Sequence, residues 1–171
     1  MPIHERAGYL SDMVFSASDG IVTTFAVVAG SAGASFGPQV VLILGFANLL
    51  ADGFSMASGN YLGKESEIEF EEAKGKDAKS EGAPLRHGIV TFITYNLAGL
   101  VPLLPFIFNM QDPFAVSTAF VGIELFAIGI IRGLFTKRKI LKSGMETFLV
   151  GGFAALVAYY VGFILEKVIG G

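Results

Sequence analysis

The chain has 171 residues, of which 53% are hydrophobic and only 16% are charged, and its formal net charge is −3. This composition is too apolar for an ordinary soluble domain and is typical of a membrane protein. Cysteine is absent, which excludes disulfides and thiolate metal sites, and the short, scattered basic clusters argue against a nucleic-acid partner.

Five apolar stretches are each long enough to cross about 30 Å of hydrocarbon as a helix, which takes about 20 residues. They cover residues 10–32, 39–62, 87–108, 114–135 and 145–167. The N-terminus lacks the basic start and short apolar core of a signal peptide, so the first stretch is expected to be a span. Because backbone groups in lipid must be paired within their own segment, helices are predicted. The fold class is therefore an all-α membrane protein with one five-helix domain over residues 1–171 and a polar loop at 64–86.

The basic residues lie almost entirely on one side of the predicted spans. Every Lys and Arg except Lys167 lies in the N-terminal segment, in the loop at 64–86 or around the end of the fourth span. Cytoplasmic loops are enriched in Lys and Arg, so the N-terminus is predicted to be cytoplasmic and the C-terminus to lie outside.

Three acidic residues are predicted to lie near the middle of the membrane. Asp19, Asp52 and Glu124 are each about ten residues from the nearest predicted membrane face, which places them about 15 Å deep at the helical rise. A charged side chain at that depth costs about 2.5–3.5 kcal/mol on insertion scales. We therefore expect each acid to face a partner, a cavity or an ion.

Two of these acids belong to polar stripes on their helices. The stripe on the first span consists of Asp12, Ser16, Asp19 and Thr23, and the stripe on the second consists of Asn48, Asp52, Met56 and Asn60. Carboxylate and amide oxygens with a thioether suit a transition-metal ion such as Fe²⁺ or Mn²⁺. The predicted metal ligands are Asp19, Asp52, Met56 and Asn60. Carboxylates also exchange protons, so Asp19, Asp52 and Glu124 are the candidates for proton coupling.

Plainer interpretations exist for several of these residues. Ser16, Thr23, Asn48 and Ser55 are also typical of the hydrogen bonds that hold membrane helices together. Met56 on its own fits a core position, and Glu124 can pair with Arg132 two turns along the same helix. His4 and His87 lie at or beyond the membrane edge, where we expect them to be solvated and without a role.

Two motifs resemble the vacuolar iron transporter family. They are SDGIVTTFAVVAG at residues 18–30 and ANLLADGFSMASGNYL at residues 47–62, with weaker similarity at 102–106 and 151–156. The resemblance implies a five-helix homodimer, not an enzyme, that moves Fe²⁺ and often Mn²⁺ out of the cytosol in exchange for protons. Asp19 and Met56 would then be ligands on the transport path, with Asp52 beside them, and the metal would be cargo with no resident cofactor.

The chain departs from that family's pattern in two places. Asn60 stands where many members have an acid, and it cannot take up a proton. Vacuolar members also carry a longer cytoplasmic domain whose glutamates collect metal, whereas here that region is only the loop at 64–86. Glu65, Glu69 and Glu72 would share a face if the second helix continued, and they are weak metal candidates, but the mixture with lysines and glycines favours a solvated linker. The chain thus resembles a small member without the large domain.

Three functions remain open at this stage. The first is export of a divalent metal by proton antiport, in the cell membrane of a prokaryote or in a vacuolar or other endomembrane of a eukaryote. The second is a membrane metal sensor or scaffold that does not transport. The third is an intramembrane aspartyl protease, which also needs two aspartates on neighbouring spans.

Overall fold

The computed structural model describes residues 3–75 and 83–169, and these residues form helices joined by short turns, with no strand among them. The elements are α1 (Ile3–Gly33), α2 (Pro38–Ala73), α3 (Pro84–Leu100), the 3₁₀ helix η2 (Val101–Leu103), α4 (Leu104–Ile107), α5 (Pro113–Thr136) and α6 (Ile140–Ile169). Five segments are long and apolar enough to span a membrane, with α3, η2 and α4 together forming the third. The predicted all-α class and the five spans are confirmed.

Helix α2 extends beyond its predicted end at residue 62, so the loop prediction is wrong for residues 64–73. This stretch contains good helix formers and no Gly or Pro, and an ion pair of 2.8 Å joins Lys64 to Glu67. The helix ends only where Gly75 adopts a positive φ of 75° and its N–H donates to the carbonyl of Glu72. The rest of the predicted loop, residues 76–82, lies outside the described residues.

The third span is not one continuous α-helix as predicted. Pro102 and Pro105 have no N–H to donate, so the regular ladder of α3 cannot continue through them, and η2 and α4 follow. Ser117 on α5, which is fully buried, donates a hydrogen bond of 2.7 Å to the carbonyl of Pro102. Helix α5 thereby supplies a hydrogen bond to the irregular backbone of the third span, which lipid could not do.

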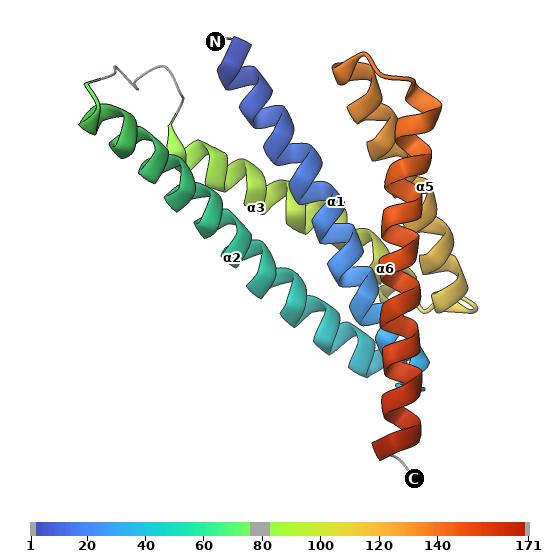
Figure 1. Cartoon of the computed structure of the whole chain (residues 1–171). Helices are drawn as coiled ribbons and strands as arrows, with labels where there is room; N and C mark the ends of the chain where they lie inside the picture. The colour runs from blue at the N-terminus through green and yellow to red at the C-terminus, as the bar shows by residue number, and fades with distance from the viewer. Residues whose placement is uncertain (1–2, 76–82, 170–171) are drawn as a thin grey trace.

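Helix α1 lies between two helical hairpins that diverge like the arms of a V (Figure 1). It packs mainly against α3 on one side and α6 on the other, while α2 packs against α3 and α5 against α6. The core between them contains Ile21, Val28, Leu103 and Leu125, which are almost completely buried. The first helix is thus the element through which both hairpins are connected.

Glycines allow α1 to approach its neighbours closely. A Cβ on Gly20 would collide with the carbonyl oxygen of Tyr95 in α3, and a Cβ on Gly99 would lie 2.7 Å from the carbonyl oxygen of Gly20. On the other side, a Cβ on Gly162 of α6 would collide with the carbonyl oxygen of Gly30. Small residues at helix crossings are the usual means of close packing in membranes.

Candidate functional site

Tyr95 of α3 lies at the point where α1, α2 and α3 meet, and it is fully buried. Its hydroxyl donates to Oδ2 of Asp52 on α2 at 2.5 Å and lies 2.5 Å from Oγ1 of Thr23 on α1. Thr23 Oγ1 is in turn 2.9 Å from the backbone carbonyl of Asp19. Tyr95, which was not among the predicted site residues, therefore bonds directly to the side chain of Asp52 and is linked through Thr23 to the backbone of Asp19.

The structure brings Asp19 and Asp52 together, as their predicted depths suggested. The carboxylates of Asp19 and Asp52 lie near enough to act on each other electrostatically, and both act on the hydroxyl of Tyr95. Asp52 is half-buried and bonded to Tyr95, whereas the carboxylate of Asp19 has no hydrogen-bond donor within residues 3–75 and 83–169. Two neighbouring carboxylates in an apolar region repel each other, so a cation or a proton between them is favoured.

The polar stripe of α2 runs along the boundary between the buried and exposed faces of the helix. Residues 45, 49, 53 and 57 are buried, residues 47, 51, 55 and 59 are exposed, and residues 48, 52, 56 and 60 are intermediate. Met56 packs partly against the core. Nδ2 of Asn60 donates to Oγ1 of Thr91 at 2.6 Å, so the amide nitrogen of this predicted ligand is turned towards α3.

No cluster of three or more His, Asp or Glu side chains arranged to hold a metal occurs in the described part of the chain. A metal held beside Asp19 and Asp52 would therefore have two carboxylates, and further donors would have to come from other groups. Met56 lies one helical turn from Asp52 and offers a thioether. Such a mixed set of oxygen and sulfur suits a soft divalent ion better than Mg²⁺ or Ca²⁺.

Glu124 does not join the aspartate pair. It lies half-buried on α5, and its Oε2 is buried without a hydrogen-bond partner in the described structure. No ion pair to Arg132 is present among the described residues, so the pairing considered from the sequence does not form. Glu124 remains a carboxyl group with an unsatisfied buried oxygen.

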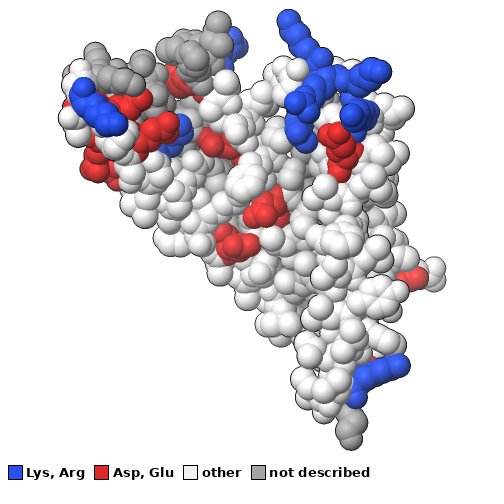
Figure 2. Space-filling view, viewed as in Figure 1, with Lys and Arg blue, Asp and Glu red and all other residues white. Residues whose placement is uncertain are grey.

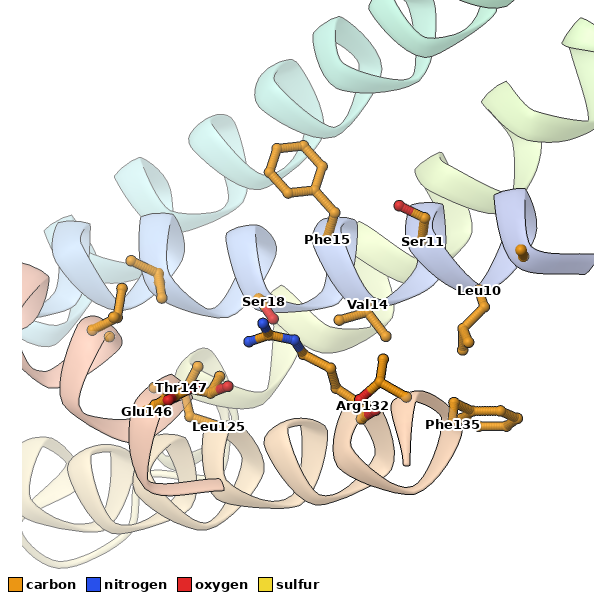
Figure 3. Close-up of a pocket in the computed structure, with 15 residues that line it drawn as sticks. Leu10, Ser11, Val14, Phe15, Ser18, Leu125, Arg132, Phe135, Glu146 and Thr147 are labelled. Carbon is orange, nitrogen blue, oxygen red and sulfur yellow. Dashed lines mark hydrogen bonds between the residues drawn. The ribbon is translucent and has the colours of Figure 1, made fainter. Parts of the chain in front are cut away.

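Arg132 instead lines a cavity of about 830 Å³ between α1, α5 and α6 (Figure 3). Its guanidinium extends towards Ser18, and the walls include Phe15, Phe135 and Thr147. None of the four predicted metal ligands lines this cavity. Arg132 and Glu146 both line the cavity, and because it lacks the predicted ligands, the cavity is not part of the candidate metal site.

The three weak metal candidates lie on the helical extension of α2, where their spacing places them on one face. Glu69 and Glu72 are exposed, and Glu65 is half-buried beside Tyr61, whose hydroxyl is hydrogen-bonded to it. The prediction of a solvated linker is wrong about the conformation, because this stretch is helical. The same prediction is right that most acidic residues of this stretch are in contact with solvent.

His87 is the clearest error among the predicted environments. Its side chain is only 1% exposed, whereas the sequence predicted a solvated position. The cause is that α1 begins at Ile3 and covers the start of α3, so that Asp12 bonds to Nδ1 of His87 and Tyr9 stacks on its ring. The side chain of His4 lies outside the described residues.

Comparison with known proteins identifies the family. The VIT family model matches residues 10–83 and 73–163. The chain belongs to the VIT family. A vacuolar iron transporter of Toxoplasma gondii is 28% identical over 95% of this chain and 76% of its own length. Vacuolar iron transporter homolog 5 of Oryza sativa is 29% identical over 88% and 77%, and vacuolar iron transporter 1 of Arabidopsis thaliana is 25% identical over 97% and 88%. The predicted family resemblance is confirmed, and with its five apolar helices this VIT protein is an integral membrane protein.

The lengths of these alignments differ between relatives. The alignment with the Toxoplasma protein runs over 229 positions, more than the 171 residues of this chain, so that relative contains inserted residues. The alignment with the rice homolog runs over only 161 positions. The two family matches meet at residues 73–83, between α2 and α3. This VIT protein is therefore short compared with the Toxoplasma relative.

Proposed function

We propose that this VIT protein exports a divalent transition-metal ion, Fe²⁺ or Mn²⁺, from the cytosol in exchange for protons. Several relatives carry the name vacuolar iron transporter, which supports metal transport. The observation that carries the proposal is the meeting of Asp19 and Asp52 beside the buried hydroxyl of Tyr95. Two carboxylates in an apolar helix bundle, with no basic partner among the described residues, need a positive charge.

The transported ion would bind to Asp19, Asp52 and Met56. The carboxylates supply charge and hard oxygens, and the thioether favours a transition metal over Mg²⁺ and Ca²⁺. Asn60 is the fourth candidate, and because its amide nitrogen is bonded to Thr91, its oxygen is the atom left to contact the ion. The metal is cargo, and the proposal includes no resident cofactor.

Proton exchange follows from the same carboxylates. When the metal leaves, the repulsion between Asp19 and Asp52 returns, and protonation of one of them relieves it. The site therefore alternates between a metal-loaded and a protonated form, which is the requirement for antiport. Glu124 is a further candidate, since its buried Oε2 has no partner in the described structure.

A homodimer would complete the site. The exposed face of α2 has small residues at every fourth position, Ala47, Ala51, Ser55 and Gly59, and a Cβ on Gly59 would meet no atom within 4 Å. This small-residue face of α2 directly borders the stripe that contains Asp52 and Met56. A second copy packed there would cover both side chains and add its own ligands.

The proposed orientation has the N-terminus in the cytosol. Basic side chains gather at the end of the molecule that contains the α5–α6 turn and the C-terminal end of α2 (Figure 2). In the same view, acidic side chains lie in the middle of a face that is otherwise uncharged. The basic end fits the cytoplasmic face, and the names of the relatives support a vacuolar or other endomembrane as the location.

The aspartyl protease has less support. In such enzymes the two carboxyl groups share a proton directly. Here the hydroxyl of Tyr95 donates to Asp52, and no hydrogen bond joins Asp52 to Asp19 in the described residues. A metal sensor or scaffold is distinguished from a transporter by the experiment below, because it would bind metal without moving it.

Metal flux into proteoliposomes tests the proposal. Wild type should move Fe²⁺ or Mn²⁺, and Asp19→Asn or Asp52→Asn should lower the flux at least about tenfold, because losing a charged contact costs about 1.5–3 kcal/mol. Glu166→Gln is the matched control, since this acid is exposed near the end of α6 and should leave flux unchanged. Binding without flux in wild type would favour the sensor, and full flux from Asp19→Asn would refute the proposed site.

A further inference from the structure

Helix α3 contains three buried polar side chains at intervals of four residues. His87, Thr91 and Tyr95 are all 1% exposed or less. Each bonds to another helix: His87 to Asp12 on α1, Thr91 to Asn60 on α2, and Tyr95 to Asp52 on α2. Four residues rise about 6 Å along a helix, so this α3 stripe leads from the end of the molecule that contains the N-terminus to the aspartate pair.

The environment of His87 is unusual for a buried histidine. Nδ1 is bonded to Oδ2 of Asp12, and the ring is stacked on Tyr9 with centroids 4.2 Å apart and planes 5° apart. Nε2 of His87 and the hydroxyl of Tyr9 are both buried without a partner among the described residues. Buried polar atoms are nearly always bonded, so an unpaired nitrogen inside a helix bundle requires an explanation.

The charges that face His87 come from few groups. Helix α1 presents Asp12 and Tyr9. From α2, Tyr61 packs beside the neighbouring Gly88, and its hydroxyl is engaged by Glu65. Arg86 on α3 itself is exposed.

Asp12 therefore depends on His87 for a positive charge. Its side chain is only 14% exposed, and no Lys or Arg pairs with it in the described structure. Its carboxylate is compensated best when the imidazole also carries a proton at Nε2.

We propose that the Asp12–His87 pair is a proton-binding site on the cytoplasmic side of the aspartate pair, and that it takes part in the proton exchange of the antiport. This inference rests on the proposed proton antiport and adds residues that the metal does not touch. The proton binds at Nε2, which forms an imidazolium beside the Asp12 carboxylate, and leaves from the same atom, so the bond at Nδ1 is retained. Imidazole is the side chain that exchanges protons near neutral pH.

This arrangement separates the proposed proton site from the metal site. The candidate metal ligands on α2 lie at the edge of its exposed face, whereas the α3 stripe is completely enclosed by α1 and α2. In the proposed orientation, the Asp12–His87 pair lies at the cytoplasmic end. Protons that displace the metal from Asp19 and Asp52 would leave to the cytosol there.

Flux measurements on His87→Gln test the inference. Proteoliposomes receive Mn²⁺ down its own gradient, with and without an imposed pH gradient, and a pH-sensitive dye reports proton movement. In His87→Gln, Mn²⁺ binding should stay within about twofold of wild type, because the metal ligands are other residues. Mn²⁺ flux driven by the pH gradient and the dye signal should fall at least about fivefold, because glutamine bonds to Asp12 but cannot bind a proton. His4→Gln, which changes the other histidine of the chain, is the matched control.

The outcomes separate this inference from the proposed function. If wild-type Mn²⁺ flux does not change with the pH gradient, both the proposed proton antiport and this inference are overturned. If wild-type flux responds to the pH gradient and His87→Gln flux responds equally, the inference alone is overturned. Loss of Mn²⁺ binding in a folded His87→Gln variant would overturn it as well.

A second measurement leaves His87 in place. In the His4→Gln protein, His87 is the sole histidine, and nuclear magnetic resonance of labelled histidine should show Nε2 both with and without a proton across the pH range in which the protein stays folded. Asp12→Asn should alter that protonation step, because the carboxylate that stabilises the imidazolium is removed. An imidazole that keeps one protonation state across this range would refute the proton-binding site.

Discussion

Tyr95 joins three helices through a single hydroxyl group. The ring fills the space between α1, α2 and α3, while the hydroxyl contacts Asp52 and Thr23. A donor to a buried carboxylate stabilises the negative charge without neutralising it, so the site remains attractive to a cation. The residue therefore serves both the stability of the bundle and the chemistry of the aspartate pair.

Removal of this hydroxyl should be measurable as a loss of stability. Tyr95→Phe keeps the ring but leaves Asp52 and Thr23 without their partner, which we expect to cost about 1–3 kcal/mol. Thermal unfolding in detergent should show a lower midpoint. Tyr160→Phe is the control, because that side chain is 58% exposed on α6 and should change little. Equal midpoints for the two variants would show that the Tyr95 hydrogen bonds add no net stability.

At the scale of the element, α1 is the helix that positions the candidate site and holds the two hairpins together. Its contacts with α3 position Thr23 and Asp19 beside Tyr95, and its contacts with α6 hold the second hairpin. Both crossings are close because glycines face backbone carbonyls. The spacing of α1 and α3 is thus set by the absence of side chains at Gly20 and Gly99.

Gly20→Ala should force α1 away from α3. The new Cβ would collide with the carbonyl oxygen of Tyr95, and backbone cannot move aside as a flexible side chain would. Overpacking of this kind costs about 1–3 kcal/mol, so we expect a lower unfolding midpoint together with reduced metal flux. Gly152→Ala has no atom within 4 Å of the new Cβ and should be neutral or slightly stabilising. Full stability of Gly20→Ala would contradict the close crossing.

At the scale of the whole molecule, one chain leaves its candidate site open on one side. The small-residue face of α2 is exposed beside Asp52 and Met56, and α6 also has few buried residues. Large apolar residues cover the outer face of α6, as suits contact with lipid. The exposed side of α2 also has large residues such as Leu50 and Phe54, but its row of small residues favours contact with another helix. The two faces therefore differ in the partner that they fit.

Cysteine cross-linking should distinguish these faces. The chain has no cysteine, so Ala51→Cys on α2 introduces a single thiol at the centre of the proposed dimer contact. Mild oxidation in membranes should yield a covalent dimer, provided that the two Cβ atoms approach to about 3.5–4.5 Å. Val157→Cys on the exposed face of α6 is the matched control and should remain monomeric. A dimer formed only by Val157→Cys would move the interface to α6.

Much of the candidate site could be predicted because helical rise is regular. Equal depths for Asp19 and Asp52 follow from counting residues, and the structure brings the two acids together. Tyr95 and His87 could not be found in this way, since their partners Asp52 and Asp12 lie 43 and 75 residues away in the chain. The one available signal was the four-residue spacing of His87, Thr91 and Tyr95 on a single helix face.

The sequence by itself determined the helical class, the five spans and the family, because hydrocarbon thickness and backbone pairing act on each segment separately. Only the tertiary structure decided which polar groups are buried together. Glycine crossings bring α1 against α3, and this contact encloses His87 and places the hydroxyl of Tyr95 against Asp52. Such contacts depend on how helices pack across the bundle, and the pattern of residues within a single span does not predict that packing.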